Sequence, residues 1–123
     1  MEICKISSEE SQSIYQCSEI ISTEHAWQVY DIDLNKAIKI LTSMPDQIYV
    51  ARANNIVQGF VTLRLQGVGN IGAYVRMLAV HRDFRGQSMG RFLIDYVQQE
   101  AEKQGDNDIF LICSTDNPDM QLL

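Results

Sequence analysis

The stretch that decides the fold runs from Met77 to Gly90 and reads MLAVHRDFRGQSMG. Its apolar beginning completes a predicted strand over residues 73–80. A basic loop containing Gly86 follows, and it leads directly into a pattern with the period of a helix, which stops at Gly105. The sequence therefore predicts a strand, a glycine-containing loop and a helix in immediate succession.

The predicted loop is suited to binding phosphate. The free N–H groups in the first turn of a helix point outward, and the helix dipole favours an anion there. Arg85 adds a positive charge suited to bidentate phosphate contact, and Gly86 and Gly90 let the backbone approach a ligand closely. The loop has neither the Gly-Lys-Ser/Thr ending of a Walker loop nor a Gly-x-Gly-x-x-Gly fingerprint. A helix start that binds nothing is the alternative interpretation.

Length and composition bound the class of protein. A chain of 123 residues has room for one core, so we expect a single domain over residues 1–123. No apolar run approaches the roughly 18 residues that span a membrane, and the N-terminus lacks the pattern of a signal peptide. The cysteines lack paired spacing, and His25 and His81 lie far apart in the sequence. We therefore expect reduced thiols in a cytoplasmic protein, with no metal site and no membrane partner.

The charge distribution favours an anionic ligand at the loop. The net charge is −6 and the isoelectric point is near 4.7, which argues against nucleic acid as a partner. Acidic residues crowd the first third of the chain, whereas the loop region carries Arg82, Arg85 and Arg91 against Asp83 alone. The acidic third could bind a cationic acceptor or could be a solvated helix face, and the pattern leaves both interpretations open.

Hydrophobic periodicity predicts the element order β-α-α-β-β-β-α-β. The expected strands cover residues 2–6, 48–53, 56–65, 73–80 and 108–114. The first expected helix follows a capping box formed by Ser7 and Glu10. The second follows Asp31 or Asp33 and runs through Leu41, and the third covers residues 88–103. Asn54-Asn55 predicts a hairpin turn. The last two strands and the helix between them predict a right-handed crossover that joins parallel strands.

Residues 74–97 resemble the cofactor loop of the GNAT superfamily of N-acyltransferases. That family's loop reads Arg/Gln-x-x-Gly-x-Gly/Ala after a strand that often contains Leu-x-Val. The matching positions here are Leu78, Val80, His81, Phe84, Arg85, Gly86, Gln87, Ser88, Met89 and Gly90, with Ser88 in place of the family's middle glycine. The element order matches as well. The resemblance implies an α+β fold of α/β/α layers around a mixed, mostly antiparallel sheet that lacks the family's last two strands.

The same resemblance implies an acetyl-CoA-dependent N-acetyltransferase. It would move an acetyl group to a primary amine, either a small amine or a peptide or protein N-terminus, by direct attack in a ternary complex. The Leu78 N–H would stabilise the oxyanion, and Tyr74 occupies the position of the family's frequent Glu base. The implied contacts to coenzyme A are Leu78, Ala79, Val80, Arg85, Gly86, Gln87, Ser88, Met89, Gly90, Arg91 and Asn117.

The chain departs from the family pattern at the loop and near its end. Ser88 keeps its backbone N–H and belongs to a residue type that caps helices, so we expect coenzyme A binding to survive. The family's general-acid Tyr would follow Leu123, where this sequence stops. The strand expected at residues 108–114 would then have an uncovered edge, which a second copy of the chain could cover.

The general base is left open by the sequence. An unperturbed phenol such as that of Tyr74 is a poor base near neutral pH. Glu24, His25 and Asp31 lie in the region that usually contacts the acceptor in the family, and each could substitute. Two alternatives to an enzyme therefore remain, namely a non-catalytic acyl-CoA-binding or regulatory module and a protein-interaction domain whose loop no longer binds a cofactor.

Overall fold

The computed structural model describes residues 2–7, 9–23, 33–43, 47–64, 73–86, 88–105 and 109–111. The elements in chain order are β1 (Glu2–Ile6), α1 (Ser11–Thr23), α3 (Leu34–Ser43), β2 (Gln47–Ala53), β3 (Ile56–Arg64), β4 (Ala73–Val80), the 3-10 turn η1 (Arg82–Phe84), α4 (Met89–Lys103) and β5 (Ile109–Leu111). The predicted order β-α-α-β-β-β-α-β is confirmed, and η1 is an addition that the sequence did not predict.

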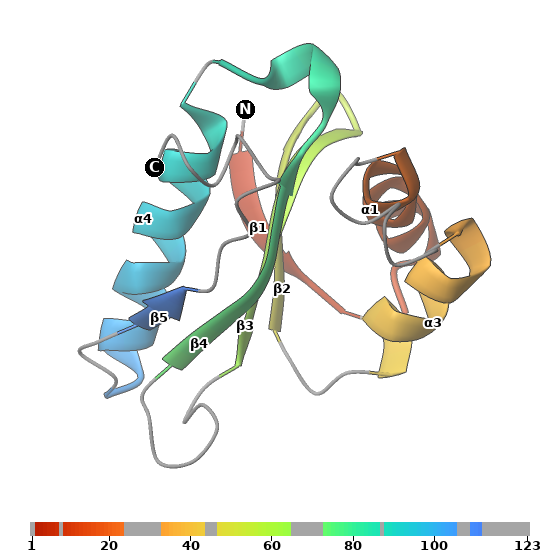
Figure 1. Cartoon of the computed structure of the whole chain (residues 1–123). Helices are drawn as coiled ribbons and strands as arrows, with labels where there is room; N and C mark the ends of the chain where they lie inside the picture. The colour runs from red at the N-terminus through yellow and green to blue at the C-terminus, as the bar shows by residue number, and fades with distance from the viewer. Residues whose placement is uncertain are drawn as a thin grey trace.

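The five strands form one sheet in the order β1-β2-β3-β4-β5. Each neighbouring pair from β1 to β4 is antiparallel, and β5 joins β4 in parallel through the crossover helix α4 (Figure 1). The β2–β3 hairpin turns at Asn54 and Asn55, whose φ angles are 53° and 66°. Asn tolerates this left-handed backbone better than most residues, and the predicted turn is confirmed. The predicted change from antiparallel to parallel pairing between β4 and β5 is confirmed as well.

Helices cover both faces of the sheet (Figure 1). The apolar stripes of α1 and α3 pack against one face, in a core formed mainly by Ile6, Ile14, Cys17, Ile20, Ile21, Ala37, Leu41, Ile48, Val50, Phe60, Met77 and Ala79. The stripe of α4 packs against the other face, in a core formed by Tyr49, Ala51, Val61, Leu63, Val75, Leu78, Val80, Met89, Leu93, Val97 and Ala101. The sheet residues of the two cores alternate within regular stretches such as Ile48 to Ala51 of β2, as the pleat requires. The predicted α/β/α layering is confirmed.

The two helices before β2 begin differently. The Lys36 N–H donates to Asp33 Oδ1 at 2.8 Å, so Asp33, one of the two predicted candidates, caps α3. The capping box predicted at Ser7 is only half formed. The Ser7 N–H donates to Glu10 Oε2 at 2.9 Å, but Ser7 Oγ accepts from the Glu9 N–H at 3.3 Å, and α1 begins only at Ser11. The hydroxyl therefore closes a tight local turn that precedes the helix.

Close packing of α4 on the sheet depends on Gly59 in β3. A Cβ at this position would lie 3.0 Å from the Ala79 carbonyl oxygen and 3.3 Å from Leu93 Cδ1. Only glycine leaves enough room for both contacts, so Gly59 sets how closely α4 approaches β3 and β4. The position of α4 matters because its N-terminus follows the predicted cofactor loop.

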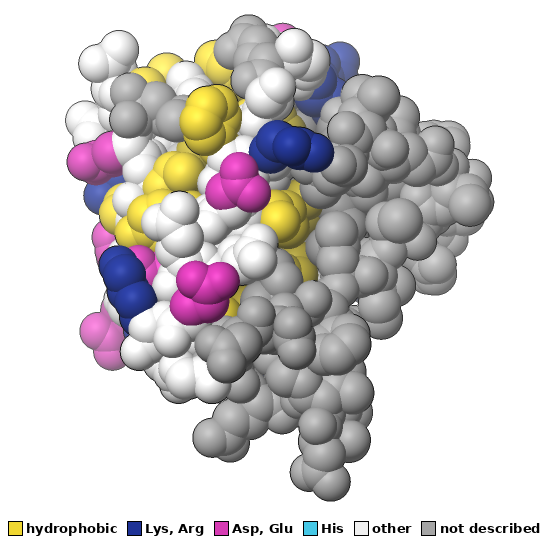
Figure 2. Space-filling view, turned by 90° about the vertical axis from the view of Figure 1, so that its left-hand side faces the viewer, with side chains coloured by type: hydrophobic (Ala, Val, Ile, Leu, Met, Phe, Trp, Pro, Cys, Tyr) yellow, Lys and Arg dark blue, Asp and Glu magenta, His cyan; other side chains and the backbone are white. Residues whose placement is uncertain are grey.

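The outer face of α4 mixes charged side chains of both signs with apolar ones, as Figure 2 shows. Arg91, Asp95 and Glu102 are exposed on this helix, and Phe92 is 53% exposed. Within the described part of the chain, no helix is long and apolar enough to cross a membrane.

Candidate functional site

A β-bulge interrupts β4 at the centre of the sheet. Gly59, Phe60 and Val61 of β3 stand opposite Val80, Ala79 and Leu78, whereas Leu63 and Arg64 stand opposite Val75 and Tyr74. The register therefore shifts by one residue between these sets, and Arg76 and Met77 together oppose the single residue Thr62. Such a bulge bends its strand and changes which side chains and backbone groups face each way beyond it.

The side chain of Thr62 completes the hydrogen bonding of the bulge. The Met77 N–H donates to Thr62 Oγ1 at 3.0 Å, and Thr62 is completely buried. A side-chain oxygen thus accepts a backbone N–H inside the bulge.

The bulge determines which backbone groups of β4 face away from β3. The His81 N–H donates to the Gln58 carbonyl at 2.8 Å, which places residue 58 among those of β3 that turn their backbone groups toward β4. Because direction alternates along a strand, Phe60 also turns toward β4, and its partner there is Ala79. The backbone N–H and C=O groups of Leu78 and Val80 therefore face away from β3. Both residues lie past Val75, the last residue of β4 that pairs with the described part of β5.

Arg85 is anchored next to this edge. Its Nε donates to the Val80 carbonyl oxygen at 3.2 Å, and its side chain is half-buried. His81 has a structural role here, because its Nδ1 accepts the Asp83 N–H at 3.1 Å and so caps η1. The turn thus connects the end of β4 to the loop and holds the guanidinium of Arg85 near the strand.

Two of the described loop residues adopt left-handed backbone. Gly86 has φ +78°, and a Cβ there would meet no atom within 4 Å. Ser88 has φ 61° and ψ 22° and stands at the N-cap of α4, but its side chain makes no capping hydrogen bond. Ser88 thus occupies the N-cap position, but its hydroxyl does not act as a cap. A capping side chain requires extended backbone at the N-cap, whereas this residue occupies the conformation that favours glycine.

The loop leads into the exposed start of α4. The Phe92 N–H donates to the Ser88 carbonyl at 3.1 Å, which begins the helical hydrogen bonding. Met89 is buried, so it anchors the first turn to the sheet, and the first turn contains no acidic residue. A helix start without acidic side chains leaves its dipole available to an anion.

Several predicted site residues lie outside the described residues, namely Gln87 and Asn117 of the cofactor set and Glu24, His25 and Asp31 of the base candidates. Tyr74 is described only through its backbone, which pairs with Arg64 and Phe110. The structure brings together Leu78, Val80, Arg85, Gly86, Ser88 and Met89 at one end of β4. The residue that the sequence analysis missed is Thr62, because a buried threonine in a strand gives no signal of a bulge on the neighbouring strand.

Residues 67–72 read GVGNIG, which has the spacing of the dinucleotide fingerprint that the loop before α4 lacks. That fingerprint works only where a helix follows the glycines, because the helix N-terminus binds the pyrophosphate. The element that follows here is the strand β4. The segment therefore does not have the context of a dinucleotide site.

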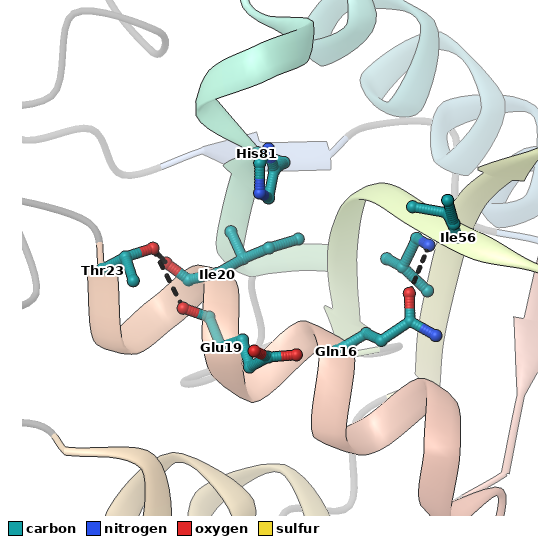
Figure 3. Close-up of a pocket in the computed structure, with 7 residues that line it drawn as sticks. Gln16, Glu19, Ile20, Thr23, Ile56 and His81 are labelled. Carbon is teal, nitrogen blue, oxygen red and sulfur yellow. Dashed lines mark hydrogen bonds between the residues drawn. The ribbon is translucent and has the colours of Figure 1, made fainter.

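A separate hollow of about 200 Å³ lies on the α1 side of the sheet (Figure 3). Its lining residues are Gln16, Glu19, Ile20, Thr23, Ile56, Val57 and His81. Both polar atoms of the Gln16 side chain are bonded to the β2–β3 hairpin. Its Oε1 accepts the Val57 N–H at 2.6 Å, and its Nε2 donates to the Asn55 carbonyl at 3.1 Å. The hollow includes neither Leu78 nor the start of α4, so it is distinct from the predicted cofactor site. Among the described residues, no three His, Cys, Asp or Glu side chains gather as metal ligands would.

Comparison with known families assigns the fold. The sequence profile of the acetyltransferase (GNAT) family matches residues 9–123. This chain belongs to the GNAT family. The resemblance seen in the cofactor loop thus extends over nearly the whole sequence, while a search of curated proteins found no significant match.

Solved structures of other proteins share the fold at low sequence identity. An aminoglycoside 6'-N-acetyltransferase complexed with coenzyme A superposes with a TM-score of 0.75 at 18% identity, over 90% of this chain but only 61% of that one. A ribosomal-protein-alanine N-acetyltransferase from Brucella melitensis biovar Abortus 2308 gives a TM-score of 0.75 at 20% identity, over 99% of this chain and 86% of that one. A transcriptional regulator from Bacillus halodurans C-125 gives 0.74 at 16% identity, over 98% and 88%. At these identities, the likeness establishes the fold alone.

Proposed function

We propose that this GNAT chain is an N-acetyltransferase that moves an acetyl group from acetyl-CoA to a primary amine. One observation carries the proposal. The outward-facing backbone groups of Leu78 and Val80 in β4 are followed directly by the loop that contains Gly86 and Ser88 and by the start of α4. Its strand half suits an extended amide-containing chain, and its loop half suits a pyrophosphate. Acetyl-CoA contains both groups.

Residues 1–123 would act as one acyl-CoA-binding domain. The pyrophosphate would lie on the N–H groups of Gln87, Ser88, Met89 and Gly90, with positive charge from Arg85 and Arg91 and closer approach allowed by Gly86. The pantetheine arm would run along Leu78, Ala79 and Val80 as an added strand, and Asn117 would also contact the cofactor. The Val80 carbonyl already accepts a bond from Arg85, so the remaining outward groups of Leu78 and Val80 would make the main contacts.

The Leu78 N–H would donate to the thioester carbonyl and more strongly to the oxyanion that forms when the amine attacks. The nitrogen lone pair forms the new C–N bond, the C–S bond breaks, and coenzyme A leaves as a thiolate that takes up a proton. A covalent route through cysteine is not supported by the described thiols, because burial raises the pKa of Cys17 to about 12 and also raises that of Cys4. Direct attack in a ternary complex therefore fits the described residues better.

The acceptor belongs to the amine class in this proposal. Two of the structural relatives are named for an aminoglycoside and for a ribosomal-protein alanine, and both kinds of acceptor react through an amine. A small amine or a peptide N-terminus would lose its proton to a base drawn from Glu24, His25 or Asp31, or to Tyr74 through water. We place the protein in the cytoplasm because Cys4 and Cys17 are free thiols.

Calorimetric titration with acetyl-CoA tests the cofactor half of the proposal. We expect micromolar binding to the unaltered chain and weaker binding to Arg85→Ala, since the guanidinium adds charge beside the loop. Glu102→Ala, an exposed change at the far end of α4, serves as the control and should bind normally. No heat at millimolar acetyl-CoA would refute the assignment of the loop.

Turnover separates the enzyme from its alternative. A non-catalytic acyl-CoA-binding module is the second candidate, and it is favoured by Tyr74 at the position of the family's Glu base. A screen of amines and N-terminal peptides, with free thiol release as the readout, should show acetyl-CoA consumption that depends on the acceptor. Binding without consumption by any acceptor would favour the module.

A further inference from the structure

The direction of the Leu78 N–H depends on the bulge in β4. If the register of Leu63 and Val75 continued without a shift, Leu78 would stand opposite Phe60. Phe60 turns its backbone groups toward β4, so the Leu78 N–H would then be bonded to β3 and could not reach a ligand. The extra residue in β4 places Ala79 in that position instead and turns Leu78 outward.

The core assignments support this account independently. Val75 before the bulge and Leu78 after it both pack on the α4 side, although three positions separate them along the chain. In a regular strand, residues three apart face opposite sides of the sheet. Met77 packs on the α1 and α3 side. The side chains therefore change face at the bulge, as the backbone groups do.

We infer that Thr62 is a positioning residue, whose hydroxyl stabilises the bulge and so keeps the Leu78 N–H directed at the thioester carbonyl; this inference rests on the proposed acetyl transfer. The Thr62 hydroxyl is the group that accepts the Met77 N–H inside the bulge, at 3.0 Å and fully buried. Without that oxygen, the buried Met77 N–H would lose this acceptor, and a regular register, reached by sliding β4 by one residue, would turn this N–H away from β3. The slide would turn Leu78 inward.

The test compares Thr62→Ser with Thr62→Cys under reducing conditions. The two variants lose the same methyl group and differ only in the acceptor atom, since sulfur accepts hydrogen bonds weakly. With kcat measured at saturating acetyl-CoA, we expect Thr62→Ser to stay within about threefold of the unaltered chain. Thr62→Cys should fall by about tenfold or more, and loss of one oxyanion donor sets an upper limit of order 100- to 1,000-fold.

Two further measurements distinguish positioning from general stability. The Kd for free coenzyme A should stay within about threefold in Thr62→Ser and should rise in Thr62→Cys, because the slide also turns inward the Leu78 and Val80 backbone groups that contact the pantetheine arm. Amide hydrogen exchange by NMR should become slower at Leu78 and faster at Ala79 in Thr62→Cys but not in Thr62→Ser, because the slide puts Leu78 in place of Ala79 opposite the inward-facing backbone of Phe60. If Thr62→Cys does not fold, Thr62→Val against the unaltered chain provides the same comparison in a side chain of similar shape.

Each outcome bears on a distinct claim. Equal kcat in folded Ser and Cys variants of an active protein would overturn the positioning role and leave the proposed function intact. Equal exchange of the Leu78 and Ala79 amides in both variants would likewise overturn it. An unaltered chain that neither binds coenzyme A nor consumes acetyl-CoA would overturn the proposed function itself, and the catalytic role of Thr62 with it.

Discussion

Replacement of Ser88 by glycine should stabilise the protein. Ser88 has φ 61° and ψ 22°, and its side chain makes no capping hydrogen bond, so its hydroxyl gives nothing to offset the strained backbone. Left-handed backbone costs an L-residue about 1–2 kcal/mol, and glycine avoids most of this cost. Glycine also has more freedom in the unfolded chain, which offsets about 0.5–1 kcal/mol of the gain. We expect a net increase of about 0.5–1 kcal/mol in the free energy of unfolding.

Urea denaturation followed by circular dichroism measures this change, and a thermal melt should show a rise in Tm of about 2–4 °C. Ser88→Ala is the matched control, because it removes the hydroxyl and keeps the strained φ, and its stability should equal that of the unaltered chain. Gly86→Ala is the converse change at φ +78°, where a Cβ meets no atom within 4 Å, and it should lose about 1 kcal/mol through backbone conformation alone. Destabilisation by Ser88→Gly would refute the reasoning, since it would mean that the hydroxyl makes a stabilising bond.

The same variant tests the cofactor loop. Because Ser88 already has the backbone conformation of a glycine, we expect acetyl-CoA affinity to change by less than about tenfold on Ser88→Gly, since a tenfold change corresponds to roughly 1.4 kcal/mol. A larger gain in affinity, measured by calorimetry, would show that the Ser88 side chain obstructs the pyrophosphate.

Three further changes test the packing, capping and titration of the fold. Gly59→Ala should destabilise the chain by about 1–3 kcal/mol in urea denaturation, because the new Cβ would lie 3.0 Å from the Ala79 carbonyl; an unchanged midpoint would refute the close packing of α4. Asp33→Ala should cost about 1 kcal/mol in the same assay through loss of the bond from the Lys36 N–H, whereas Asp33→Ser should retain most of it. Burial raises the pKa of Cys17 from 9.0 to about 12, so its thiol stays protonated in the folded state while the unfolded thiol ionises. The contribution of Cys17 to the free energy of unfolding is therefore present below pH 9 and is lost by about 1.4 kcal/mol per pH unit between pH 9 and 12. Cys17→Val should remove this part of the decrease in the free energy of unfolding with pH. Identical pH dependence in the variant and the unaltered chain would contradict the prediction.

The sequence by itself determined the elements and their order. Apolar periodicity located the helices and strands, because each element must bury one stripe or face. Asn54-Asn55 located the hairpin, since few residues tolerate its left-handed backbone. The strand, loop and helix from Met77 onward also identified the family, because backbone chemistry restricts which residues can surround a pyrophosphate. These features depend on residues close together in the chain.

Only the tertiary structure decided where the functional groups point. The direction of the backbone groups in β4 follows from a bulge. That bulge depends on Thr62, which lies 15 positions from Met77 in the chain. The left-handed backbone of Ser88 is likewise visible only in the tertiary structure, because a serine at an N-cap usually has extended backbone and caps the helix with its hydroxyl. A periodic pattern specifies which face is buried, but the register between strands comes from contacts across the sheet, and a shift of one residue reverses which N–H groups are available to a ligand.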